Sequence, residues 1–107
     1  MHNFNIVTSG LPHPKYRNIE IMETTLSLFN QINSLSYWFL HQSRFKCVIK
    51  LDAEIDEYYV SVRKNNETLY TYSINRFSKK NRSYLEFELR SIVNQLLYFK
   101  EYVAEAS

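Results

Sequence analysis

Hydrophobic and polar residues alternate in three consecutive runs, at residues 45–51, 58–63 and 68–74. Successive side chains of a β-strand point to opposite faces, so this alternation predicts three strands with one buried and one solvated face. The apolar positions of the first two runs share one face: Phe45, Cys47, Ile49, Leu51, Tyr58, Val60 and Val62. The intervening positions form the other face: Lys46, Val48, Lys50, Tyr59, Ser61 and Arg63. We therefore expect a small antiparallel sheet whose outer face is mildly basic.

Two longer segments repeat apolar residues every three or four positions, which is typical of amphipathic helices. The first set is Met22, Leu26, Phe29, Ile32, Leu35 and Phe39. The second set is Leu85, Leu89, Ile92, Val93, Leu96, Phe99 and Val103. We expect the first helix to follow an Asn18 cap and to end near Gln42. Ser83 and Glu86 have capping-box spacing, which predicts that the second helix begins near Tyr84.

Turn residues and chain ends complete the predicted order of elements. Asn65 and Asn66 separate two strands, and asparagine tolerates the positive φ that tight hairpins require. Residues 3–8 alternate weakly and form an optional first strand, while prolines at 12 and 14 predict an extended loop over residues 9–17. Residues 104–107 are expected to be a frayed tail. The prediction is a single α+β domain over residues 1–107, a two-layer sandwich in the order (β)-α-β-β-β-α, with a three- to four-stranded antiparallel sheet and both helices on one face.

Composition limits where the protein works. The 107 residues are 45% hydrophobic, enough for one core without disulfides or metals. A lone cysteine cannot form an internal disulfide and no secretory signal pattern is present, which favours a cytoplasmic location. The longest uncharged stretch, residues 24–43, contains too many Asn and Gln side chains to cross a membrane, so no membrane partner is expected. The many Asn, Tyr, Ile and Lys residues indicate AT-rich codons, as in a low-GC bacterium, a virus or a mobile element.

Recognisable catalytic chemistry is missing from the sequence. Its three histidines and one cysteine have no zinc-ligand spacing, and its single glycine leaves no phosphate-binding loop. The acidic link Asp52, Glu54, Asp56 and Glu57 offers oxygen ligands, but an EF-hand loop starting at Asp52 needs Gly at 57 and Glu at 63, where Glu57 and Arg63 stand. We therefore expect a protein that is not an enzyme and has no metal, cofactor or small-molecule substrate.

The first helix is unusual because no charged residue occurs between Thr24 and Ser43. Solvated helix faces usually carry Lys and Glu, whereas the centres of protein interfaces lack these charges and are rich in Tyr and Trp. The candidate interface residues are Ser27, Asn30, Gln31, Ser34, Tyr37, Trp38 and His41. The leading hypothesis is a small inhibitor or adaptor that binds another protein, or itself as a homodimer, through this face. Packing of Tyr37 and Trp38 into the core is the competing interpretation.

Basic residues provide an alternative hypothesis. They lie on the outer sheet face and in the loop before the second helix, and the set with its aromatic member is Lys46, Lys50, Tyr59, Arg63, Arg76, Lys79, Lys80 and Arg82. Lysines and a helix N-terminus attract phosphate, so this set is a candidate site for RNA, DNA or an acidic protein. An ordinary solvated surface explains the same residues, because the net charge is only +2.

With Lys79 and Lys80 at the entry to the second helix, the expected order is similar to that of the double-stranded RNA-binding domain. That resemblance implies phosphate contacts for these lysines, but it covers element order only, from about Asn18 to Tyr102. The family's glycines before the second helix are absent here. With the optional strand included, the order also resembles ribosome hibernation factors. Their helices carry basic residues where this chain has Ser27, Asn30, Gln31, Ser91 and Asn94. Element order alone does not fix function.

Overall fold

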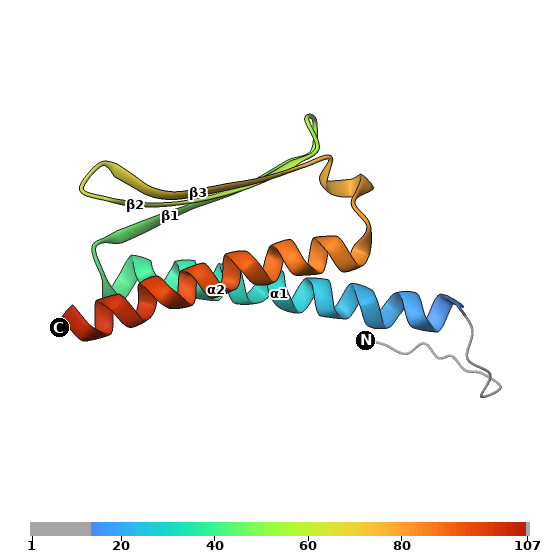
Figure 1. The fold of residues 1–107 in the computed structure, drawn as a ribbon, viewed down its shortest axis with the longest axis horizontal. Coiled ribbons are helices and arrows are strands. Elements are labelled where there is room, and N and C mark those ends of the chain that lie inside the picture. Colours follow the sequence, from blue (N-terminus) through green and yellow to red (C-terminus); the bar gives the residue numbers. More distant parts are fainter. Residues whose placement is uncertain (1–13, 107) are drawn as a thin grey trace.

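The computed structural model describes residues 14–106, and their side chains over residues 24–103. Its elements are α1 (Pro14–Gln42), β1 (Phe45–Asp52), β2 (Glu57–Lys64), β3 (Glu67–Asn75), a short 3-10 helix η1 (Phe77–Lys79) and α2 (Arg82–Ala106). The two helices lie side by side in one layer beneath the sheet (Figure 1). The predicted two-layer α+β fold in the order α-β-β-β-α is confirmed; the optional strand at residues 3–8 lies outside the described residues.

The sheet has the order β1-β2-β3, with both neighbouring pairs antiparallel. Asn65 and Asn66 have φ values of 53° and 66°, which confirms the expected hairpin turn. The register shifts between Val62 and Arg63, where Leu69 is the extra residue of a bulge in β3. This register places the inward residues of all three strands over the helix layer.

The core fills the space between the two layers. Its buried residues are Leu28, Ile32, Leu35, Phe39, Phe45, Tyr58, Val60, Val62, Ile74, Leu89, Ile92, Val93, Leu96 and Phe99. Aromatic rings link the layers: the Phe45 ring centroid lies 5.8 Å from that of Phe39 on α1 and 5.4 Å from that of Phe99 on α2. Such pairs contribute about 0.5–1.5 kcal/mol each beyond the area that they bury. The first strand is therefore held against both helices.

Helix α1 differs from its prediction at two places. It begins at Pro14, so residues 14–17 are helical and Asn18 is not its cap. Proline suits the first position of a helix, where its missing N–H needs no partner. The core-facing positions include Leu28, whereas Leu26 is 52% exposed. Leu26 is six residues before Ile32, which turns it about 120° away from the core.

Helix α2 begins at Arg82, two residues before the predicted start at Tyr84. Asn81 is the cap: its Oδ1 accepts hydrogen bonds from the backbone N–H groups of Ser83 at 2.9 Å and Tyr84 at 3.3 Å. Arg90 and Glu86, one turn apart on α2, form an ion pair at 3.6 Å. Residues 104–106, expected in a frayed tail, continue the helix because no glycine or proline interrupts it.

Two strand positions differ from the simple alternation. Leu51 lies near the end of the edge strand β1 and stays 57% exposed, because an edge residue has a strand neighbour on one side only. Ser61 points to the outer face but is only 2% exposed. It is on the central strand, opposite Val48 and Thr71, and these larger side chains shield it. Within residues 14–106 neither helix is apolar enough over a sufficient length to span a bilayer.

Candidate functional site

The outer face of α1 is exposed and uncharged over the described part of the helix. Its solvent-exposed residues from position 26 onward are Leu26, Ser27, Asn30, Gln31, Asn33, Ser34, Tyr37, Leu40, His41 and Gln42. We call this set, together with Trp38, the α1 face. Tyr37 is 66% exposed and Leu40 55% exposed, so Tyr37 is not part of the core. A helix surface that meets only water seldom lacks Lys and Glu over this length.

The last turns of α1 form a shallow, open depression in this face. It is lined by Ser34, Tyr37, Trp38, His41 and Gln42. The Tyr37 and His41 rings meet edge to face with their centroids 4.5 Å apart. Trp38 is half-buried: it packs against the core, and the Lys100 Nζ of α2 lies 5.0 Å from its ring centroid. The aromatic walls are thus held in place by contacts within the chain, while Tyr37 remains accessible.

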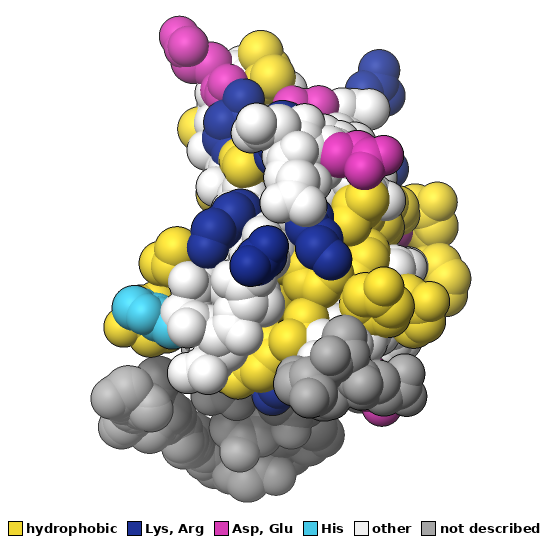
Figure 2. Space-filling model, turned by 90° about the vertical axis from the view of Figure 1, so that its left-hand side faces the viewer, with side chains coloured by type: hydrophobic (Ala, Val, Ile, Leu, Met, Phe, Trp, Pro, Cys, Tyr) yellow, Lys and Arg dark blue, Asp and Glu magenta, His cyan; other side chains and the backbone are white. Residues whose placement is uncertain are grey.

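Charged side chains begin immediately beyond this depression. Figure 2 shows this end of the molecule, with a histidine and hydrophobic side chains on the left and Lys and Arg side chains in the middle. Lys46 is close to the end of α1, since its Nζ donates to the backbone carbonyls of Leu40 at 3.4 Å and Ser43 at 3.5 Å. A cation at a helix C-terminus is favourable because the last carbonyls lack intrahelical partners. The α1 face therefore has a basic border at its C-terminal end.

The outer sheet face gathers four of the predicted basic-site residues. Lys46 is opposite Arg63, and Lys50 is opposite Tyr59, whose ring centroid lies 5.8 Å from the Lys50 Nζ. Hydrogen bonds with the Thr71 and Ser61 hydroxyls, helped by the charges of Lys50 and Arg63, lower the pKa of Tyr59. Arg63 is held by its own hairpin, donating to Thr68 Oγ1 at 3.2 Å and to the Asn66 carbonyl at 3.0 Å.

The other four basic residues follow the end of β3 that is far from Lys46 and Arg63, whereas Lys50 and Tyr59 are near this same end because Tyr59 pairs with Ser73. Arg63 is beside the β2–β3 hairpin, whereas Arg76 and Lys79 follow the far end of β3. A strand of nine residues spans about 30 Å. Lys79 is also near Asp56, whose carboxylate accepts hydrogen bonds from the backbone N–H and the hydroxyl of Ser78.

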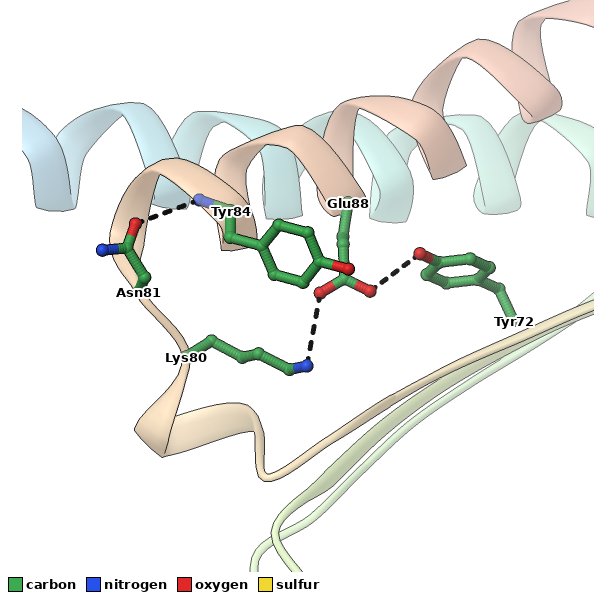
Figure 3. Close-up of polar contacts among 5 residues, drawn as sticks. All are labelled: Tyr72, Lys80, Asn81, Tyr84 and Glu88. Carbon is green, nitrogen blue, oxygen red and sulfur yellow. Dashed lines mark hydrogen bonds and ion pairs between the residues drawn. The ribbon is translucent and has the colours of Figure 1, made fainter.

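Lys80 is removed from the basic site by a buried carboxylate that the sequence analysis missed. Glu88 of α2 is only 6% exposed; its Oε1 accepts a 2.7 Å hydrogen bond from the Tyr72 hydroxyl, and its Oε2 lies 3.8 Å from the Lys80 Nζ (Figure 3). The Lys80 Nζ also lies 5.1 Å from the Tyr84 ring centroid. Burial, followed by the hydrogen bond to Glu88, raises the pKa of Tyr72 to about 12. Glu88 is three positions after Leu85 and therefore lies on the inward side of the helix. A charged residue at an inward position is the sequence signal that could have revealed this buried carboxylate.

The acidic link and the cysteine have structural contacts. The Asp52 carboxylate accepts from the backbone N–H groups of Glu54 at 3.0 Å and Ile55 at 3.4 Å, closing the turn between β1 and β2. Over the described chain, no three His, Cys, Asp or Glu side chains are grouped as metal ligands would be. Burial raises the pKa of the Cys47 thiol, which disfavours the reactive thiolate.

Comparison with known proteins supplies no relative. No protein-family model matches the chain, and no curated protein or solved structure is significantly similar to it. Its function must therefore be inferred from its surfaces.

Proposed function

We propose that this chain is a small protein-binding protein, an inhibitor or adaptor, that docks another protein on the α1 face. The observation that supports the proposal is the exposed run of uncharged side chains from Leu26 to Gln42. Interface centres are poor in charged residues and rich in aromatic ones, and their strongest contacts are Tyr, Trp and Arg side chains in small pockets. The depression lined by Tyr37, Trp38 and His41 has this composition.

The spacing of the exposed apolar residues favours a helical partner segment. Leu26, Tyr37 and Leu40 recur near the three- and four-residue spacing of one helix side, with Asn30 and Asn33 between them. An amphipathic helix can lie along such a stripe and bury its own apolar side chains against it. The basic border at the end of α1 would favour a partner helix whose adjoining end is acidic.

Photo-crosslinking at position 37 tests the proposal. A benzophenone amino acid replaces Tyr37 in the cells from which the chain comes, and the matched control places it at Ile55, which is 62% exposed in the turn between β1 and β2. We expect an adduct with one foreign protein from position 37 and none from position 55. The purified partner should then bind Tyr37→Ala at least about fivefold more weakly than wild type, as for a residue that contributes more than about 1 kcal/mol.

Three results would contradict the proposal. They are equal adducts from positions 37 and 55, adducts only with a second copy of this chain, and unchanged partner affinity in a folded Tyr37→Lys, Leu40→Lys variant. Circular dichroism checks that each variant is folded. Exposed positions tolerate lysine, so these variants should keep the stability of the wild type within about 0.5 kcal/mol.

The outer sheet face supports a second candidate function, binding of nucleic acid or another anionic partner. The register brings Lys46, Lys50 and Arg63 to one face around Tyr59. Titration of labelled single-stranded and duplex RNA at two salt concentrations tests this candidate. It predicts affinity that falls steeply with salt and is lost on replacing the three basic residues by glutamine. Absence of binding at low salt would exclude it.

A further inference from the structure

A second exposed stripe, uncharged and mainly aromatic, runs along α2. The side chains recur every three or four residues, and all are exposed: Tyr84, Phe87, Ser91, Asn94, Tyr98 and Tyr102. Phe87 is 67% exposed. Lys100 faces α1, since its Nζ lies over the Trp38 ring, and Ser91 and Tyr98 point about 160–180° away from it. This set, the α2 stripe, is therefore on the side of the helix layer opposite α1.

The strand above the α2 stripe is a sheet edge, which a bulge interrupts at Leu69 and which is regular from Tyr70 to Asn75. Both β1 and β3 are edge strands of the described sheet. On β1 the lysines at positions 46 and 50 give the protection that edge strands usually have. On β3 the only charged residue is Glu67, at its first position, and the rest are uncharged Thr, Tyr, Leu, Ser, Ile and Asn. Such an edge readily contacts another chain.

The α2 stripe and the β3 edge are on the same side of the molecule, and the middle of one lies above the middle of the other. A groove lined by Glu67, Leu69, Tyr98 and Tyr102, among other residues, joins them at the hairpin end. The Tyr70 ring centroid lies 6.4 Å from that of Phe99, and the Tyr72 hydroxyl bonds Glu88. The middle of β3, at residue 71, is thus above the region near residue 93, which is also the middle of the α2 stripe.

The α2 stripe has the same order of residue types, aromatic then polar then aromatic, in both directions along the helix. Two aromatic residues occur at each end, and Ser91 and Asn94 are near the centre. A two-fold axis through the shared midpoint places Tyr84 against Tyr102 of a second copy and Phe87 against its Tyr98, with the two β3 edges beside each other. Closed two-fold contacts need this kind of self-complementary surface.

Charge selects the antiparallel arrangement of the two helices. The approach to α2 is basic, with the exposed Arg76 and Lys79, and its last turns carry the exposed Glu101, while Lys100 lies over Trp38 on the side of α1. An antiparallel pair places the basic end of one copy beside the acidic end of the other, whereas a parallel pair places like charges together. We propose that a second copy of this chain covers the α2 stripe and the β3 edge in an antiparallel, two-fold symmetric dimer.

Sedimentation analysis and cysteine crosslinking test this dimer. We expect the 12.9 kDa chain to sediment as a dimer, and Phe87→Lys or Tyr98→Lys to raise its dissociation constant at least about tenfold. The matched control Ile55→Lys should leave the dissociation constant unchanged. In a Cys47→Ser background, Ser91→Cys should crosslink to itself. Tyr84→Cys should not crosslink to itself, but it should crosslink to Tyr102→Cys in a mixture of the two.

Several results would overturn the proposal: a monomeric wild type, an unchanged dimer in folded Phe87→Lys and Tyr98→Lys variants, or self-crosslinking of Tyr84→Cys, which requires parallel helices. Tyr37→Lys separates this inference from the proposed function of the α1 face. Tyr37→Lys should leave the dimer intact while weakening the binding of the foreign partner. Loss of the dimer in this variant would show that the two copies contact each other through α1 instead.

Discussion

The hydroxyl of Tyr72 donates a 2.7 Å hydrogen bond to the buried carboxylate of Glu88, which ties the edge strand β3 to helix α2. Lys80 approaches the second oxygen of the same carboxylate from the loop that enters α2. A buried carboxylate is costly unless it is paired and hydrogen-bonded, so these two partners make its position tolerable. The cluster therefore fixes the path from η1 into α2 relative to the sheet.

Removing the Tyr72 hydroxyl should destabilise the protein. We expect Tyr72→Phe to lower the free energy of unfolding by about 1–3 kcal/mol, because the Glu88 carboxylate loses its hydroxyl donor while it stays buried. Urea denaturation measures this change. Tyr37→Phe, which removes an exposed hydroxyl, should change the free energy by less than about 0.5 kcal/mol and is the control. A double variant with Glu88→Leu should recover part of the loss, and equal stability of Tyr72→Phe and wild type would contradict the assignment.

The core-facing side of α1 gives a direct mutational comparison. Leu28 is 2% exposed and Leu26 is 52% exposed, although the residues are two positions apart. Leu28→Ala should cost about 2–5 kcal/mol of unfolding free energy through lost burial and a cavity, and Leu26→Ala less than about 0.5 kcal/mol. Chemical denaturation of both variants measures the difference. A larger loss for Leu26→Ala would show that the helix is rotated from the orientation described.

Periodicity was sufficient to predict the three strands, the two helices and their order. It left the rotation of α1 ambiguous, because Leu26 and Leu28 both lie within reach of the stripe that contains Ile32, Leu35 and Phe39. Only the positions of the sheet and α2 decide between them. The α1 face was accessible from the sequence because its uncharged composition is a local property.

The contacts of the basic residues were not accessible in the same way. Lys80 belongs to the predicted basic set, but its partner Glu88 is on the next element, and β3 brings the Tyr72 hydroxyl to the same carboxylate. The sequence pattern did not identify the α2 stripe either. Aromatic residues at helical spacing are expected to face a core, and only the position of α1 shows that these residues are on the exposed side of α2. Such properties depend on tertiary packing, which a pattern along the chain does not contain.

The turn asparagines should respond in opposite directions to glycine and valine. Asn65 and Asn66 both have φ in the left-handed region. Asn66→Gly should preserve or slightly raise stability, whereas Asn66→Val should lower the free energy of unfolding by about 1–2 kcal/mol, because a β-branched side chain clashes at positive φ. Thermal unfolding compares the two variants. Ser73→Val, which introduces a β-branched side chain at an exposed position of the adjoining strand, is the control and should be tolerated. Equal stability of Asn66→Val and Asn66→Gly would contradict the assigned turn.

Stability should fall at alkaline pH because burial raises the pKa of three tyrosines, Tyr58, Tyr70 and Tyr72, in the folded chain. Burial raises the pKa of Tyr58 from 10.0 to about 12, and burial with the Glu88 hydrogen bond raises that of Tyr72 to about 12. Between pH 10 and pH 12 the unfolded chain releases these protons while the folded chain keeps them. The stabilisation is therefore complete below about pH 10 and is lost as the pH rises towards 12.

The free energy of unfolding, measured in urea at a series of pH values, checks this dependence. A Tyr58→Phe, Tyr72→Phe variant should show a shallower fall than wild type over the same interval, which separates the contribution of these two tyrosines from that of all other groups. Tyrosinate absorbance adds an independent readout: Tyr59, whose pKa is lowered, should ionise before Tyr58 and Tyr72, and Tyr59→Phe should remove the earliest step. A free energy that stays constant up to pH 12 in wild type would contradict the burial of both hydroxyls.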